Sequence, residues 1–157
     1  GANIGEDVTY SGTIAAAMEA TLLGVPSIAL SQRYESGDRV RWKTAEHWGA
    51  KTVRALLKEG WPDNVLINVN FPDLPSAQVS GIRAGKQGEH DVWDAFEERI
   101  DPRGRTYFWV GQDQIQVVTG TPGTDLRAIN DGYVAVTPLH LDLTHRPTLT
   151  RFHKVFN

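Results

Sequence analysis

The sequence predicts an α/β fold whose first strands are parallel. Two helix–strand units support this prediction. In the first, an apolar helix over residues 14–23 passes through a glycine turn into an apolar strand over residues 26–31. In the second, an amphipathic helix over residues 38–59 precedes an apolar strand over residues 65–71. Helices that alternate with short, continuously apolar strands are typical of βαβ units, which place their strands in parallel.

Both helices have recognisable ends. Ser11 or Thr13 can cap the first helix, and Pro26 cannot continue it beyond the turn at Gly24. Its apolar residues lie nearly all round, which predicts burial on more than one side. The second helix carries its apolar residues on one side and ends at Gly60, which is the pattern of an amphipathic helix.

After the second unit the chain changes character. A short strand over residues 79–84 precedes the aromatic segment 92–110, which the turn sequence at 101–105 divides, so we expect a long β-hairpin arm. A two-stranded ribbon is marginal alone, and its aromatic side chains call for a covering surface. Internal core, subunit contact and a base-stacking platform are the alternatives. We favour subunit contact, because acidic residues offset the arginines that a stacking groove would need.

Three elements complete the predicted fold. Thr124 or Asp125 caps a short helix, an apolar strand over residues 132–137 stops at Pro138, and a helix over residues 147–156 ends the chain. We expect one domain with three parts: an α/β core portion over residues 1–78, a strand plus hairpin arm over residues 79–118, and a return to the core with a tail helix over residues 119–157.

The composition excludes several classes of protein. The 157 residues are 40% hydrophobic and 22% charged, as in ordinary globular domains. A net charge of −3, with scattered Lys and Arg, argues against DNA binding. No apolar run approaches the ~20 residues of a membrane span, so we expect no membrane partner. There is no cysteine, which excludes disulfides and thiolate metal sites and favours the cytoplasm.

The opening segment, residues 1–13, is the most informative one. A glycine-rich polar loop runs into Ser11, Gly12 and Thr13, and helix-forming residues follow at once. The N–H groups of the first helical turn, the two hydroxyls and the Asn3 amide can converge on one oxyanion. The alternative is a plain helix cap after a glycine turn. Glu6 and Asp7 would repel phosphate, and we expect them to be structural. The sequence opens inside this element, so we expect the back part of a longer protein, with the amino-terminal part of its sheet missing here.

The whole chain resembles, in order, the SurE family of nucleotidases. The resemblance implies a Rossmann-like, three-layer fold with a protruding β-hairpin arm and a C-terminal helix. It also implies a metal-dependent phosphatase that hydrolyses nucleoside 5′- and 3′-monophosphates and, in some relatives, short polyphosphate. Subunits of the family exchange elements to form dimers or tetramers, here through the hairpin between Trp93 and Trp109 and the C-terminal tail. The matching blocks are residues 1–19, 24–29, 66–72, 96–104 and 124–139.

The resemblance also implies site residues. Phosphate-binding positions map onto Asn3, Ser11, Gly12 and Thr13, with Asn3 and Ser11 as catalytic residues. The family's Mg²⁺ or Mn²⁺ ligands, an Asp-Asp pair, a Ser and an Asn, would lie upstream of Gly1, so these residues alone are expected to be inactive. Two alternatives remain: a non-catalytic, oligomerising α/β module, and an acyl or glycosyl transferase that uses the helix start for a phosphorylated donor.

Three other polar segments carry weaker signals. His140, Asp142 and His145 could be drawn as a metal cluster, but their spacing at a strand end forces no convergence, and a surface or interface role is favoured. The segment 119–124 lacks the Lys-Ser/Thr ending of a phosphate loop, so we expect a turn and a cap. Residues 86–88 are expected near the nucleotide side of the site.

Overall fold

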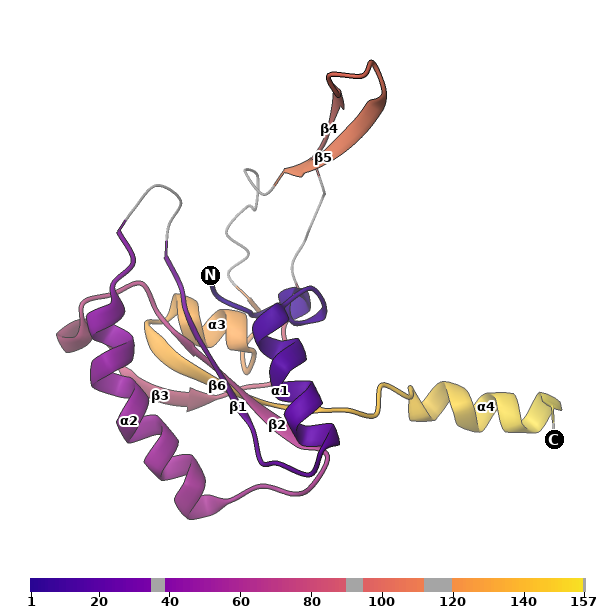
Figure 1. The fold of residues 1–157 in the computed structure, drawn as a ribbon. Helices are drawn as coiled ribbons and strands as arrows, with labels where there is room; N and C mark the ends of the chain where they lie inside the picture. The colour runs from indigo at the N-terminus through magenta and orange to yellow at the C-terminus, as the bar shows by residue number, and fades with distance from the viewer. Residues whose placement is uncertain (35–38, 90–94, 112–119, 157) are drawn as a thin grey trace.

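A mixed sheet forms the centre of the structure, a computed structural model that describes residues 1–34, 39–89, 95–111 and 120–156 (Figure 1). Within these ranges the sheet has four strands: β1 (Ile28–Gln32), β2 (Val65–Phe71), β3 (Gly81–Ala84) and β6 (Tyr133–His140). Their order is β1-β2-β6-β3. β1 runs parallel to β2, as predicted, and β3 runs parallel to β6, whereas β2 and β6 are antiparallel.

The described helices are α1 (Gly12–Leu22), α2 (Trp42–Glu59), α3 (Asp125–Asn130), α4 (Arg146–Phe156) and the 3₁₀ turns η1 (Gly5–Thr9) and η2 (Ser76–Gln78).

Helices on both faces of the sheet give three layers. Successive side chains of a strand point to opposite faces. Leu66 of β2 therefore packs with Ile14 of α1, whereas Ile67 belongs to a cluster that includes Trp48 of α2. On the face that carries α1, α3 packs against Ala135 of β6. Figure 1 shows α2 and α1 on opposite sides of the sheet. The predicted α/β architecture is confirmed.

The predicted hairpin arm is also confirmed. β4 (Ala95–Ile100) pairs antiparallel with β5 (Thr106–Gly111). The carboxylate of Asp101 closes the turn by accepting the N–H groups of Arg103 and Arg105 at 2.8 and 2.9 Å. These contacts, with the Arg105 N–H first, lower the pKa of Asp101. The arm projects from the body (Figure 1), and Phe108 is exposed on it. Trp93, predicted to belong to the arm, lies outside the described residues.

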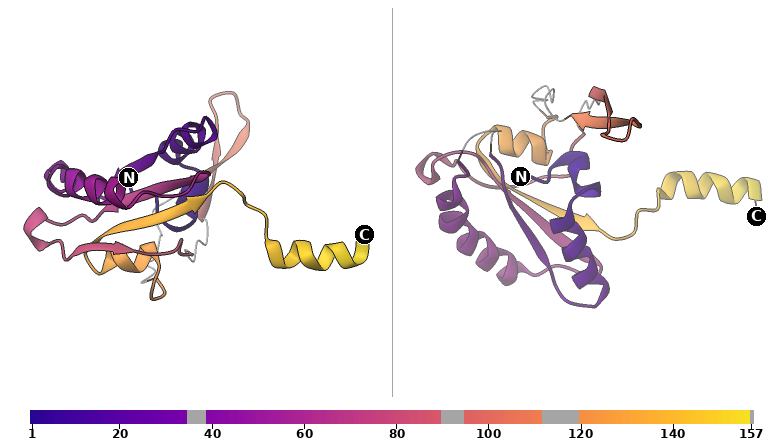
Figure 2. Two further views of the ribbon diagram at one scale, coloured as in Figure 1. Left: turned by 90° about the horizontal axis from the view of Figure 1, so that it is seen from below. Right: turned by 45° about the horizontal axis from the view of Figure 1, so that its top comes forward.

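The C-terminal helix stands apart from the sheet. α4 projects away from the body in both views of Figure 2. None of its described residues is buried. Its apolar side chains are instead turned to solvent along the helix, and the rings of Phe152 and Phe156 contact each other edge to face with centroids 5.9 Å apart. The sequence correctly predicts this helix, whose first residue is Arg146.

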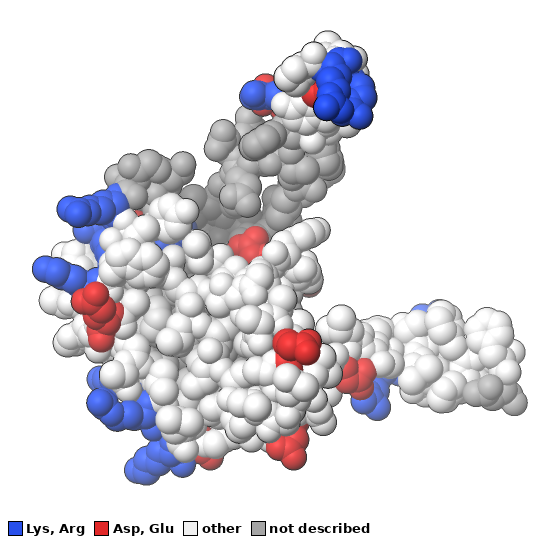
Figure 3. Space-filling model, in the orientation of Figure 1, with Lys and Arg blue, Asp and Glu red and all other residues white. Residues whose placement is uncertain are grey.

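Burial of α1 on more than one side is not observed. Ile14, Ala17 and Thr21 are its buried residues, and they form a single stripe against the sheet. Leu22 and Leu23 are 68% and 73% exposed. The prediction fails because no element in the described ranges packs on the outer side of this helix. Figure 3 shows this face of the molecule largely without charged side chains.

The prediction that Pro138 ends the last strand is wrong, because β6 continues through it to His140. Pro138 lies opposite Ile67 of β2, whose N–H donates to Ser27 on the β1 side. Ile67 and Pro138 therefore form a non-hydrogen-bonded pair of the antiparallel ladder, in which β2 needs no N–H donor at residue 138. On the other side of β6, pairing with β3 ends at Val136. A residue without an N–H fits this position at no loss.

Two predicted boundaries shift by a few residues. α2 begins at Trp42 rather than at residue 38, which lies outside the described part of the chain. The N–H groups of Trp42 and Thr44 bond to the carbonyls of Val40 and Arg41, so a turn leads into the helix. β3 begins at Gly81 rather than at residue 79.

The core makes a testable prediction at Phe71. This side chain is 1% exposed and packs towards α2, where a Cβ built on Gly49 would lie 3.7 Å from its Cζ. Phe71→Ala should lower the free energy of unfolding by about 3–5 kcal/mol, because it removes buried apolar area and leaves a cavity. Leu57→Ala, on the exposed side of α2 at 64% exposure, should change it by less than about 1 kcal/mol. Urea denaturation measures both, and equal losses would contradict the assigned core.

Candidate functional site

The N-terminal segment is held against the sheet by two buried asparagines. Asn68 and Asn70 alternate with apolar residues in β2, so both point to the face that carries α1, and both are 0% exposed. The N–H of Asn3 donates to Oδ1 of Asn70 at 2.7 Å. The carbonyl of Asn3 accepts from Nδ2 of Asn68 at 2.7 Å and from Nδ2 of Asn70 at 3.1 Å. Both backbone groups of Asn3 are thereby satisfied.

The side chain of Asn3 reaches the neighbouring strand. Its Nδ2 donates to Oγ of Ser31, near the carboxyl end of β1, at 2.6 Å. The predicted catalytic residue Asn3 thus lies over the carboxyl-terminal parts of two parallel strands. Ligands of α/β sheets bind beside these strand ends. No role of Asn68 or Asn70 is predicted from the sequence. Two amides spaced by two in an apolar strand are nevertheless a usable signal, because buried amides need partners.

The start of α1 is a capped helix end, and the anion-binding role predicted for it stays a prediction. Ser11 is extended and accepts the N–H of Ile14 at 3.1 Å, so it caps the helix. The N–H groups of the first turn have no acceptor within the helix. Gly12 and Thr13 are exposed, so their N–H groups are accessible from solvent. The cap and the anion site are compatible, because the Ser11 hydroxyl and these two N–H groups belong to the same turn.

The loop between Asn3 and Ser11 is anchored at Gly5. Its N–H donates to Oδ2 of Asp125 at 3.0 Å, and its carbonyl accepts from Nε2 of Gln87 at 3.0 Å. Gly5 has φ = 55°, a left-handed conformation that favours glycine. Glu6 and Asp7 follow in the first turn of η1, where both are half-buried. The sequence predicts Thr124 or Asp125 as the cap of α3, and Thr124 takes this role, because its Oγ1 accepts the Arg127 N–H.

A cavity of about 840 Å³ opens beside Ser11. One wall is formed by η1 and α1, and the other by the end of β6 and the segment that follows β3. Lys86 and Gln87 line it, and Gln87 also contacts the opening loop at Gly5. That residues 86–88 lie near the nucleotide side of the site stays a prediction. Met18 and Leu139 contribute to a lining that is mainly apolar.

His140, Asp142 and His145 form a turn instead of a cluster. The N–H of Asp142 donates to Nδ1 of His140 at 3.1 Å, while Nδ1 of His145 contacts Oγ1 of Thr148 at 2.7 Å. Hydrogen bonds from Thr144, first from its side chain, lower the pKa of Asp142 to about 2, and Arg146 adds a smaller effect. In the described ranges, no three His, Cys, Asp or Glu side chains are grouped to hold a metal ion.

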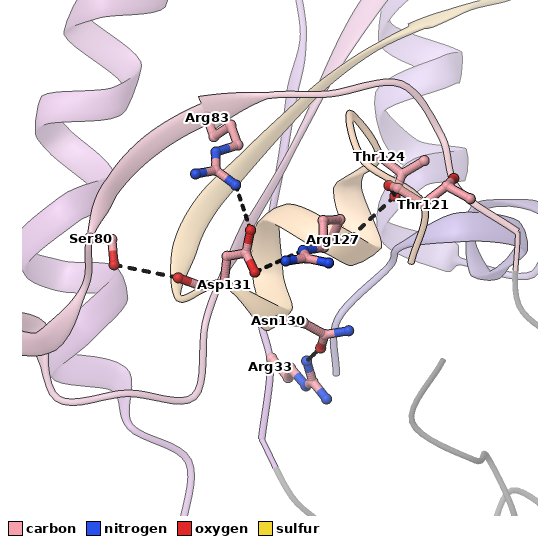
Figure 4. A network of polar contacts seen from close by, with 8 residues as sticks. All are labelled: Arg33, Ser80, Arg83, Thr121, Thr124, Arg127, Asn130 and Asp131. Atoms are coloured by element: carbon pink, nitrogen blue, oxygen red, sulfur yellow. Dashed lines mark hydrogen bonds and ion pairs between the residues drawn. The ribbon is translucent and has the colours of Figure 1, made fainter. Parts of the chain in front are cut away.

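A second polar network fixes the far end of α3 (Figure 4). Asp131 accepts from Arg83 at 2.7 Å and from Arg127 at 2.8 Å. Both contacts, Arg127 first, lower the pKa of Asp131. The guanidinium of Arg83 also lies 3.6 Å from the ring centroid of Tyr133. This network joins α3 to β3 and contacts none of the predicted site residues, so its role is to hold the sheet and helix together.

Comparisons with known proteins identify the family. A family model described as "Survival protein SurE" matches residues 1–94. The chain belongs to the SurE family. Proteins named "5'-nucleotidase SurE" from Paramagnetospirillum magneticum and Methylobacterium sp. are 51% and 52% identical to it, over 99% and 97% of this chain and 60% and 61% of their own length. The chain thus spans about 60% of the length of these curated relatives.

A solved SurE structure confirms the fold. The "Crystal Structure of Sure Protein from Aquifex aeolicus" matches with a TM-score of 0.81 and 35% sequence identity. The match covers 100% of this chain and 62% of that protein. The SurE architecture therefore includes the parts of the chain beyond residue 94. None of the described helices has the length and hydrophobicity needed to cross a lipid bilayer.

Proposed function

We propose that this chain belongs to a nucleotidase that hydrolyses nucleoside 5′- and 3′-monophosphates and also short polyphosphate. The names of the relatives support the reaction class. The observation that carries the proposal is the exposed, capped start of α1. Upstream of it in the same loop, the buried asparagines of β2 hold Asn3 over the carboxyl-terminal parts of β1 and β2. The loop from Asn3 to Thr13 binds the phosphate of the substrate.

The chemistry of this loop suits a phosphate dianion. The start of a helix combines outward N–H donors with the positive end of the helix dipole. Lys86 lines the same cavity as Ser11 and adds a positive charge to it. Donors that are already oriented can stabilise the charge that develops on the phosphoryl oxygens during transfer. Asn3 and Ser11 therefore act by binding and orienting the phosphate.

From the resemblance alone, we propose that the reaction needs Mg²⁺ or Mn²⁺. The described side chains do not fit such an ion, because they offer no cluster of three acidic or imidazole ligands. On this proposal, the ligands of the metal are residues of a SurE protein other than these 157. On this proposal, these residues alone bind phosphate weakly and do not hydrolyse it.

Substitutions at Ser11 test the proposal in a protein of the relatives' full length that carries this sequence. Ser11→Ala removes both the cap and a phosphate donor and should lower kcat/KM by roughly 10²–10³. Ser11→Asp restores a good cap, because Asp and Ser are equivalent at this position. It also places a carboxylate where phosphate binds. The Asp variant should therefore keep the wild-type midpoint of thermal unfolding and lose activity on AMP with Mn²⁺.

Ser80→Ala is the matched control, because it deletes an exposed hydroxyl at the entrance to β3, away from the loop. It should leave kcat/KM unchanged. Near wild-type activity of the folded Ser11→Asp variant would show that phosphate does not bind at the start of α1.

We further propose that α4 and the arm form contacts between subunits. Leu149, Phe152 and Phe156 are spaced by three and four residues, so they share one side of α4, and all are at least 38% exposed. An isolated helix of 11 residues is marginal in water, as is an isolated two-stranded ribbon. A second copy of the chain that covers these side chains would stabilise both elements.

Light scattering after gel filtration tests this contact in the full-length protein. Replacing Phe152 and Phe156 together by Glu should reduce the mass of the assembly, because two charges would have to be buried. Arg151→Glu changes the charge of the same helix without removing apolar area and should have a smaller effect. An unchanged mass for the double variant would contradict a role of α4 in assembly.

A further inference from the structure

One buried carboxylate joins the opening loop to the base of the arm, which is formed by residues 86–88 and 120–125. Asp125 is 0% exposed. Its Oδ2 accepts the N–H of Gly5 at 3.0 Å, and its Oδ1 accepts the N–H groups of Gly88 and Leu126, each at 2.8 Å. Hydrogen bonds to a carboxylate are among the stronger ones in proteins, and a buried N–H left without its acceptor is costly. The carboxylate therefore fixes three backbone segments relative to one another.

Two of these segments are the legs of the arm. Gly88 lies on the segment that leads from β3 towards β4, and α3 follows the segment that returns from β5. These two segments are called the legs of the arm. The legs are also bonded directly, since Lys86 donates to the Gly123 carbonyl and accepts from the Asp125 N–H, both at 2.9 Å.

Close packing leaves the legs little freedom to shift. A Cβ added to Gly88 would lie 2.7 Å from Cδ1 of Leu126 and 3.0 Å from Oδ1 of Asp125. A Cβ added to Gly120 would lie 2.6 Å from the backbone nitrogen of Arg127. Contacts this short show that the backbones meet with no spare volume. A movement at the base of the arm must therefore move the carboxylate of Asp125.

The third segment is the loop that leads to the start of α1. Gly5 is held on both of its backbone polar groups, by Asp125 on the N–H and by Gln87 on the carbonyl. Both partners belong to the base of the arm. The η1 turn, which starts at Gly5, connects this anchor to Ser11.

We propose that Asp125 is a positioning residue of the phosphate-binding loop. This proposal rests on the proposed function. Asp125 is buried and acts through the Gly5 backbone, not by touching substrate. When the carboxylate is lost, the loop of the unliganded protein is no longer fixed in one conformation. Part of the free energy of substrate binding must then be used to order the loop. Binding of a phosphate group is weakened more than turnover of the bound complex.

The test is Asp125→Asn in a SurE protein of full length that carries this sequence. Asn has the same shape but only one acceptor oxygen, so its NH₂ group must face the N–H of either Gly5 or Gly88. Amide hydrogen exchange should rise at least about tenfold at the glycine that the NH₂ group faces, and less at the other, whose acceptor becomes a neutral amide. KM for AMP and the inhibition constant of inorganic phosphate should each rise about tenfold, with a smaller change in kcat, because binding is lost equally from the ground and transition states.

Asp131→Asn is the matched control. It makes the same change just beyond the same helix and removes contacts to Arg83 and Arg127, but not to the loop. It should leave exchange at Gly5 and Gly88, KM and the phosphate inhibition constant at wild-type values. Gln87→Ala is a second variant, at an exposed side chain. It should raise amide exchange at Gly5 and KM for AMP, and it should leave amide exchange at Gly88 unchanged.

Two results would overturn the positioning role. One is an active Asp125→Asn protein with wild-type KM and wild-type exchange at both Gly5 and Gly88. If Asp125→Asn does not fold, the other is Gln87→Ala with no change in either quantity. Failure of the proposed function would look different, because the wild-type protein would then not hydrolyse AMP with Mn²⁺, whatever the exchange at Gly5.

Discussion

The pairing of Asn3 with two buried amides of β2 is the interaction on which the rest of the site depends. Asn68 and Asn70 lie in a strand that is otherwise apolar, and without Asn3 their polar groups would be buried without these partners. Each unpaired group would cost about 1–3 kcal/mol. The sheet therefore binds this one backbone segment strongly and in one register. Everything that follows it, the Gly5 anchor, the η1 turn and the capped start of α1, takes its position from there.

The molecule combines this fixed site with two elements that extend from the body. The arm and α4 expose aromatic and aliphatic side chains, and the outer side of α1 is also apolar and exposed. Surfaces of this kind mark contacts with other protein. The base of the arm is nevertheless rigid, because Asp125 and the tightly packed glycines bind it to the opening loop. On the proposals made above, the arm, as a subunit contact, and the loop, as the phosphate-binding segment, are both attached to this one structural support.

The sequence predicts the local features of this structure better than the long-range ones. Apolar periodicity, glycines and prolines are sufficient to identify α1, α2, β1, β2 and the hairpin. The prediction that Pro138 ends the last strand is wrong, because a proline ends a strand only where a neighbouring strand needs its N–H as a hydrogen-bond donor. The anion-binding role of residues 11–13 is predicted from the Ser-Gly-Thr cap, but the Gly5–Asp125 contact is not. It joins residues 120 positions apart, and no local pattern reports it.

The central claim is that the start of α1 holds the phosphate of the substrate. Crystals of a full-length SurE protein carrying this sequence, soaked with manganese and vanadate, test it most directly. The account predicts vanadate oxygens within about 3 Å of the Gly12 and Thr13 nitrogens and next to Ser11. Vanadate bound at any place remote from this turn would contradict it.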